Sequence, residues 1–91
     1  MTDLRNRALR FALQERPRFK EEYFELVSIP SVSTDPTHKP DMLRAAEWLA
    51  AKLTTIGLEH VQILATNGHP VVYADHLHAG ENRPTVLIYG H

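Results

Sequence analysis

Apolar residues recur at helical spacing in the first part of the chain and predict two consecutive helices. The first helix has its apolar residues at Leu4, Ala8 and Phe11, and the second at Phe19, Tyr23, Leu26 and Val27. Asp3 is a suitable cap for the first helix, and Pro17 is well suited to the first turn of the second. Pro30 ends the second helix because the residue before a proline is pushed out of the α region. Residues 31–39 are then expected to form a loop.

The most regular amphipathic pattern starts at Pro40-Asp41 and predicts a third helix. On a helical projection its apolar side chains fall within an arc of roughly 100°. They are Met42, Ala45, Ala46, Leu49, Leu53 and Ile56. Gly57 is expected to end the helix in the left-handed conformation. The width of the arc predicts that four of these side chains pack against one face of a sheet, namely Met42, Leu49, Leu53 and Ile56.

Alternating apolar and polar residues then predict a strand over Val61–Thr66, and Val71–Leu77 is expected to return as a second strand. Asn67-Gly68 lies between them. Both residues tolerate the positive φ angles that a two-residue primed turn requires. The sequence therefore predicts an antiparallel hairpin with a tight turn at Asn67-Gly68.

After a turn through residues 80–84, the apolar run Val86–Tyr89 predicts a third strand that is buried on both faces. Such an interior strand needs a neighbour on each side and cover on both faces, which 91 residues can hardly provide. The fold class is therefore predicted to be α/β, with residues 1–91 forming the opening part of a larger domain that is cut off at this strand. A small α+β interaction module without catalysis, complete at residue 91, remains the alternative.

The composition excludes several classes of function. Hydrophobic residues make up 43% of the chain and charged residues 23%, and the net charge is −1 with both signs mixed along the sequence. No nucleic-acid or membrane partner is therefore expected. No apolar stretch approaches the roughly 20 residues that span a bilayer, and the N-terminus lacks the apolar core of a signal peptide. The absence of cysteine excludes disulfides and fits a cytoplasmic protein.

His91 is the main candidate for a metal ligand. It follows Gly90 directly at the carboxyl end of the predicted third strand, where functional side chains gather in open α/β sheets. A catalytic zinc needs at least three protein ligands, so this chain alone is expected to hold no zinc.

The other candidate residues have simpler explanations. His76 and His78 are two apart, so on a strand both would face one side, but Asp75 would face the other and no third ligand is visible. They are interpreted as a solvated strand end. His69 is assigned a turn or packing role beside the hairpin turn, and His38 and His60 show no pattern. No catalytic residue is assigned. The hydroxyl residues Ser31, Ser33 and Thr34 are interpreted as loop and helix-cap residues. The carboxylates of Glu21, Glu22 and Glu25 are interpreted as the solvent-exposed face of an amphipathic helix.

Four segments resemble the M20 metallopeptidases, a family of two-zinc dipeptidases, aminoacylases and deacylases. They are Ile29–Ser33, Met42–Leu49, Asn67–Ala74 and Thr85–His91, in the order found in that family. In the family the last segment continues into a His-x-Asp motif, so the resemblance implies that His91 binds one of two zinc ions. It also implies that the chain belongs to a three-layer zinc-exopeptidase-like domain.

The resemblance, which is strongest to the dipeptidase branch, further implies a function. The complete protein would cleave dipeptides or N-acyl amino acids with a metal-activated water, and would be a homodimer. The 91-residue chain alone is expected to be inactive, because the remaining ligands and the general base lie outside it. Dipeptidase, aminoacylase and deacylase activities stay open.

Overall fold

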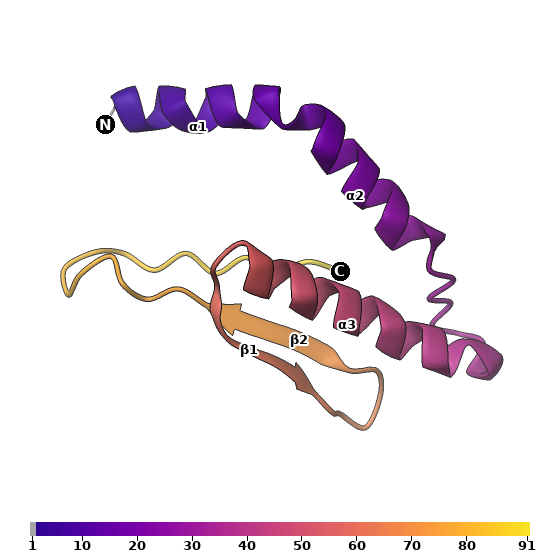
Figure 1. Ribbon diagram of the computed structural model, residues 1–91. Helices are drawn as coiled ribbons and strands as arrows, with labels where there is room; N and C mark the ends of the chain where they lie inside the picture. The colour runs from indigo at the N-terminus through magenta and orange to yellow at the C-terminus, as the bar shows by residue number, and fades with distance from the viewer. Residues whose placement is uncertain (1) are drawn as a thin grey trace. The chain divides into compact units, whose positions relative to one another are not determined.

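The computed structural model describes residues 2–91 and contains three α-helices, one 3₁₀ turn and one pair of strands. The elements in chain order are α1 (Thr2–Gln14), α2 (Arg16–Ser28), η1 (Pro36–His38), α3 (Lys39–Thr55), β1 (Glu59–Leu64) and β2 (Val71–Asp75), as Figure 1 shows. The chain divides into two compact units, Met1–Ala45 and Ala46–His91, with the boundary inside α3. A small α/β fold is therefore confirmed.

The two N-terminal helices form as predicted. Asp3 lies inside the first turn of α1 rather than capping it, because the helix already includes Thr2. Pro17 stands in the first turn of α2. Ile29 ends α2 in an extended conformation (φ −76°, ψ 118°), as expected for a residue that precedes a proline.

The predicted loop over residues 31–39 contains the short turn η1, so α3 begins earlier than expected. The side chain of Asp35 accepts a hydrogen bond from the backbone N–H of Thr37 at 2.9 Å and so starts η1, which leads into α3 at Lys39. At its other end α3 stops before Gly57, whose φ of 95° confirms the predicted left-handed cap.

The strands β1 and β2 pair antiparallel, as predicted, but the prediction of a tight turn between them is wrong. The pairing ends at Leu64 and Val71, so Asn67-Gly68 lies within a longer connection, and Gly68 does not take a positive φ. Two local features explain the difference. Pro70 has no N–H to offer to the ladder, and the Thr66 hydroxyl accepts from Gly68 N and donates to the His69 carbonyl oxygen.

A bulge interrupts β1 near its start. Gln62 pairs with Tyr73 and Glu59 pairs with Asp75, so two residues of β1, His60 and Val61, stand opposite one residue of β2. In an uninterrupted ladder with the register of Gln62, Glu59 would face residue 76. The bulge therefore brings Glu59 opposite Asp75.

The predicted third strand does not form. Val86–Tyr89 adopts no regular secondary structure, and each of its side chains is at least 79% exposed. A strand requires a neighbour that supplies hydrogen-bond partners, and the sheet described in residues 2–91 contains only β1 and β2. An interior strand is therefore the wrong description of this segment in the chain as it stands.

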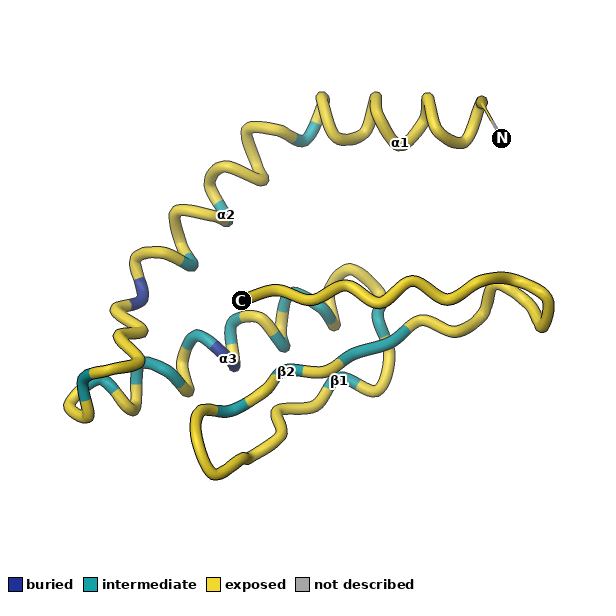
Figure 2. Tube along the Cα trace, turned by 180° about the vertical axis from the view of Figure 1, so that it is seen from behind, coloured by how far each residue is buried: buried dark blue, intermediate teal, exposed yellow. Residues whose placement is uncertain are grey.

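Burial is confined to two apolar positions, Ile29 and Ala46, among the described residues (Figure 2). Ala46 lies on the apolar arc predicted for α3, so the phase of that helix is right. The predicted packing is wrong for Leu49 and Ile56, which are 38% and 68% exposed, whereas Met42 and Leu53 are half-buried. A two-stranded sheet is too narrow to cover the arc, and Ile56 lies beyond the end of α3.

Candidate metal centre

Three side chains of metal-ligand type meet where β1 begins and β2 ends. Glu59, His60 and Asp75 each offer one ligand atom, and these atoms lie within 4.8 Å of one another. Nδ1 of His60 is 2.8 Å from Oδ1 of Asp75. The second carboxylate oxygen of Asp75 accepts a hydrogen bond from the Tyr73 hydroxyl at 2.8 Å.

The backbone of the bulge places His60 in this group. His60 has a φ of 54°, the left-handed region that few non-glycine residues adopt and that histidine tolerates better than most. Together with the altered register, this conformation sets an imidazole beside the carboxylate of the opposite strand. The side chain of His60 is 69% exposed and that of Asp75 only 15%, so the cluster has one half-buried carboxylate and an accessible imidazole.

His78 and His76 extend the cluster along the chain. Nε2 of His78 contacts Oε1 of Glu59, which links His78 to the three-residue group. The rings of His76 and His78 meet edge to face with centroids 5.2 Å apart. Both residues lie beyond the end of β2, which is two residues shorter than the predicted strand Val71–Leu77. The interpretation of His78 as a merely solvated strand end misses its contact with Glu59.

The hydrogen bonds of the cluster shift the pKa values of its side chains. The pKa of Asp75 lies below its ordinary value, first because of the hydrogen bond with His60 and then because of the Tyr73 hydroxyl. The pKa of His60 is raised, chiefly by its hydrogen bond with Asp75. The same carboxylate raises the pKa of Tyr73. Each of the two partners, Asp75 and His60, therefore favours the charged form of the other.

His91 does not join this cluster. Its Nδ1 lies 2.8 Å from the hydroxyl of Tyr89, and it is not part of any group of three or more ligand-type side chains within residues 2–91. The prediction that His91 is a metal ligand stays a prediction. His60, which showed no pattern in the sequence, is instead a histidine of the three-residue cluster, and only the hairpin register and its bulge place it beside Asp75.

The remaining candidates that the structure describes make local contacts. His38 lies between two carboxylates at the start of α3, with Nδ1 2.9 Å from Oδ2 of Asp41 and Nε2 3.9 Å from Oδ2 of Asp35. Glu22 forms an ion pair with Arg18 along α2, as expected for the solvent-exposed face of a helix. The backbone carbonyl of His69 takes part in the loop between the strands.

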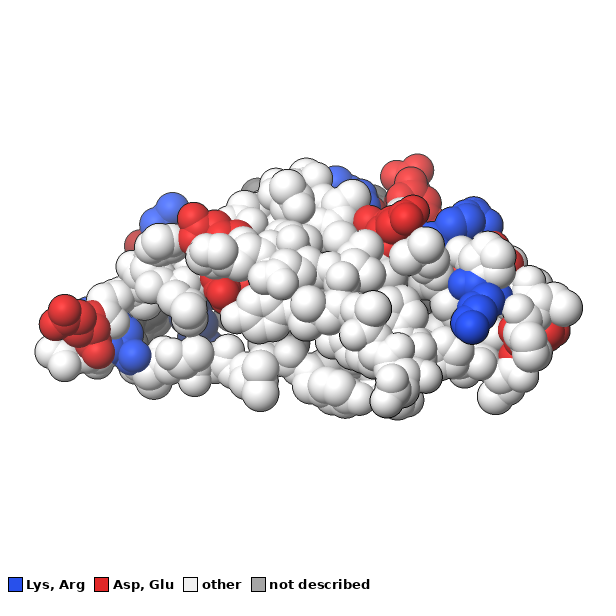
Figure 3. Space-filling model, turned by 90° about the horizontal axis from the view of Figure 1, so that it is seen from below, with Lys and Arg blue, Asp and Glu red and all other residues white. Residues whose placement is uncertain are grey.

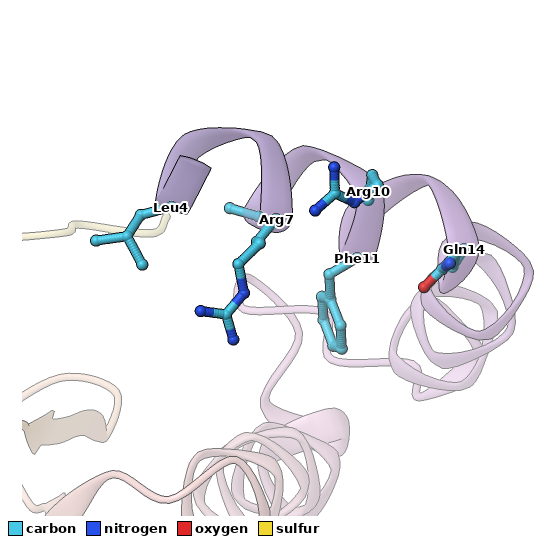
Figure 4. Close-up of a pocket in the computed structure, with 6 residues that line it drawn as sticks. Leu4, Arg7, Arg10, Phe11 and Gln14 are labelled. Carbon is cyan, nitrogen blue, oxygen red and sulfur yellow. The ribbon is translucent and has the colours of Figure 1, made fainter. Parts of the chain in front are cut away.

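A shallow hollow lies on α1, and all the residues that line it belong to this helix. Figure 4 shows the side chains of Leu4, Arg7 and Phe11 projecting from the same side of α1. The complete lining is Leu4, Arg7, Ala8, Arg10, Phe11 and Gln14. None of these residues is an acid or a histidine, so this hollow offers neither a metal ligand nor a general base.

The surface charge agrees with the composition. On the face seen in Figure 3, acidic and basic side chains alternate without a broad patch of one sign. None of the helices described in residues 2–91 is both long enough and apolar enough to cross a membrane.

Comparison with known proteins gives one informative relative. The chain is 34% identical over 87 residues to the Cys-Gly metallodipeptidase DUG1 of Candida albicans, an alignment that includes 84% of this chain. The chain spans 18% of the length of that protein. No protein-family model matches the chain, and no solved structure matches it. The chain is therefore related to a metallodipeptidase.

Proposed function

We propose that this chain is the N-terminal part of the catalytic domain of an M20-type metallopeptidase that hydrolyses dipeptides or N-acyl amino acids. The observation that carries the proposal is the 34% identity to a Cys-Gly metallodipeptidase over most of the chain. The order of the four resembling segments, from Ile29–Ser33 to Thr85–His91, supports the same assignment. We further propose that the complete protein acts in the cytoplasm as a homodimer with two zinc ions.

The exposed apolar residues support a larger domain. Val86–Tyr89 is an apolar run whose backbone has no strand partner, and Leu49 on α3 and Ile56 just beyond its end are exposed. Large apolar side chains that are exposed in this number are typical of a face that another part of a protein covers. In this proposal the rest of the catalytic domain covers α3 and adds strands beside Val86–Tyr89, so that His91 comes to lie at the carboxyl edge of a completed sheet.

The residues around His91 do not make a zinc site by themselves. His91 supplies one imidazole, and its described contact is the hydroxyl of Tyr89. Catalytic zinc takes at least three protein ligands, so no step of hydrolysis can be assigned to residues of this chain. The contribution proposed for this chain is one ligand and the scaffold that holds it.

Expression of the 91-residue chain and of the chain extended through its natural continuation tests this proposal. The extended protein should hydrolyse a dipeptide such as Cys-Gly in the presence of zinc, and the 91-residue chain should not. His91→Asn in the extended protein should abolish hydrolysis, whereas His69→Asn, in the loop between the strands, should retain it. Hydrolysis by residues 1–91 alone, or an extended protein that is folded, loaded with zinc and inactive on both substrate classes, would contradict the proposal.

A further inference from the structure

The end of the β1–β2 hairpin carries a second set of metal-ligand side chains that is separate from His91. Glu59, His60 and Asp75 present their ligand atoms within 4.8 Å of one another, and His78 contacts Glu59 from the following segment. We propose that Glu59, His60 and Asp75 bind one divalent transition-metal ion of the zinc type, with His78 placed to supply a further imidazole. This site rests on the geometry of the hairpin and not on the proposed peptidase function.

The contacts of His60 suit it to metal binding. A metal-ligating histidine commonly gives its other ring nitrogen to a carboxylate, which fixes the tautomer and orients the ring. In His60, Nδ1 already lies 2.8 Å from Asp75, and the side chain is 69% exposed. For all three side chains to bind one ion, Asp75 has to release Nδ1 and turn an oxygen to the ion, and the exposed imidazole then supplies one ring nitrogen.

Asp75 provides the ordered part of the site. Its side chain is only 15% exposed, and it is held both by His60 and by the Tyr73 hydroxyl. Glu59 stands opposite Asp75 in the strand pairing because of the bulge. A site whose ligands are ordered beforehand loses less conformational entropy when it binds.

Only a small movement separates the observed positions from coordination. Zinc takes nitrogen and oxygen ligands at about 2.0–2.2 Å, so ligand atoms around a tetrahedral ion lie roughly 3.3–3.6 Å apart. No two of the three ligand atoms are more than 4.8 Å apart, so any pair needs to approach by at most about 1.5 Å, whereas the 2.8 Å contact of His60 with Asp75 needs to lengthen. The exposed side chains of Glu59 and His60 allow this by rotation without moving the strands.

The donor set selects the kind of ion. Imidazole is a good ligand for zinc, copper and nickel, whereas magnesium and calcium prefer sites made of oxygen atoms alone. A group of one or two imidazoles with two carboxylates therefore favours zinc over magnesium. Glu59 and Asp75 would also neutralise the charge of the ion, and water would complete its coordination.

Calorimetric titration of the metal-free 91-residue chain with zinc chloride tests the proposal. One zinc ion should bind per chain, and magnesium chloride should give no comparable heat. In nuclear magnetic resonance spectra, the chemical shifts that zinc changes should be those of Glu59, His60 and Asp75. His60→Asn and Asp75→Asn should each weaken zinc binding roughly tenfold or more. Asparagine tolerates the left-handed backbone of residue 60, so His60→Asn keeps the bulge while removing the imidazole.

His91→Asn and His69→Asn are the matched controls, and both should bind zinc like the unchanged chain. Circular dichroism of every variant shows whether the fold is retained. Failure of the unchanged chain to bind zinc saturably would overturn the proposal, as would zinc binding that His91→Asn abolishes and His60→Asn leaves intact. Zinc that binds only by bridging two chains, seen as a zinc-dependent dimer in sedimentation, would also overturn it. None of these results depends on whether the extended protein is a peptidase.

Discussion

The backbone N–H of Leu58 donates to the carbonyl oxygen of Leu53 at 3.0 Å, so the chain folds back over the end of α3. A second bond, from Gly57 N to Thr54 O at 3.1 Å, completes a Schellman motif with Gly57 in the left-handed position. This turn leads directly into Glu59, the first residue of β1. The end of a helix and the start of the candidate metal centre are therefore joined by one glycine-dependent turn.

Gly57→Ala should destabilise this turn by about 1–2 kcal/mol, the cost of a left-handed conformation for a residue with a Cβ. No heavy atom lies within 4 Å of the position of the added Cβ, so the cost comes from the backbone alone. Urea denaturation followed by circular dichroism measures the effect. Gly68→Ala is the control and should be nearly neutral, because Gly68 has no positive φ and its nearest neighbour, Thr66 Oγ1, would be 3.8 Å away. Equal losses in both variants would contradict the argument.

The start of α3 should be weakened by acid. The pKa of Asp41 is lowered, first by its hydrogen bond with His38 and also by Arg44. A carboxyl group whose folded pKa lies below its unfolded value stabilises the fold above that unfolded value, near pH 4. This stabilisation is lost as the pH falls through the folded pKa. Helix content measured by circular dichroism should therefore decrease on acidification below about pH 4.

Asp41→Asn should remove part of this acid dependence and lower the helix content at neutral pH. It deletes the negative charge from the first turn of α3, where the helix dipole favours it. Glu47→Gln is the control, because it removes an acid from the same helix without touching His38. The same acid profile for Asp41→Asn and the unchanged chain would show that the His38–Asp41 contact, 2.9 Å long, does not act in solution.

The connection between the strands should depend on Thr66. Its hydroxyl accepts from Gly68 N at 2.9 Å and donates to His69 O at 2.7 Å. Thr66→Val keeps the shape and removes both bonds, so the hairpin should lose about 1–2 kcal/mol. Amide hydrogen exchange of β1 and β2 reports the loss. Thr85→Val, in the segment without regular structure, should leave that exchange unchanged; a similar effect from both would point to a general change of the chain.

The helices of this fold are predictable because their signals are local. Pro17, Pro30 and Gly57 act on the backbone within one turn of their own positions, and all three have their expected effects. Asn67-Gly68 is also a local signal, but it competes with Pro70 and with the hydroxyl of Thr66, which select a longer connection.

The candidate metal centre depends on pairing between distant parts of the chain, so its composition was not predictable. His60 and Asp75 are 15 residues apart, and a bulge sets which residues stand opposite. No sequence pattern predicts that bulge. A glycine would be the usual signal for a residue in the left-handed conformation, and this chain has His60 at that position. The prediction of a third strand is wrong for a related reason. Val86–Tyr89 has the composition of a strand, but a strand forms only beside a neighbouring strand with which it can hydrogen-bond.

The exposed run Val86–Tyr89 should make the 91-residue chain prone to self-association. Leu87 and Ile88 are 90% and 88% exposed, and unpaired apolar segments of β-forming residues are typical aggregation sites. Leu87→Lys should raise the solubility of the 91-residue chain and reduce its light scattering at high concentration. In the extended protein the same substitution should instead impair folding, because it would bury a charge.

Leu77→Lys is the control for this prediction. Leu77 is 64% exposed and lies outside the apolar run, so its replacement should change solubility less than Leu87→Lys does. An equal gain from the two variants would show that added charge, rather than the apolar run, governs association of the chain.

Within residues 2–91, burial of Ile29 and Ala46 alone has a consequence for how this chain loses its structure. Cooperative unfolding requires elements to share a buried core, so that the loss of one exposes the others. With so little shared burial, the helices and the hairpin are free to open one at a time. Their amide protons would then exchange with solvent at separate rates, each set by its own hydrogen bonds, and a protease could cut between elements while the neighbouring ones stayed intact.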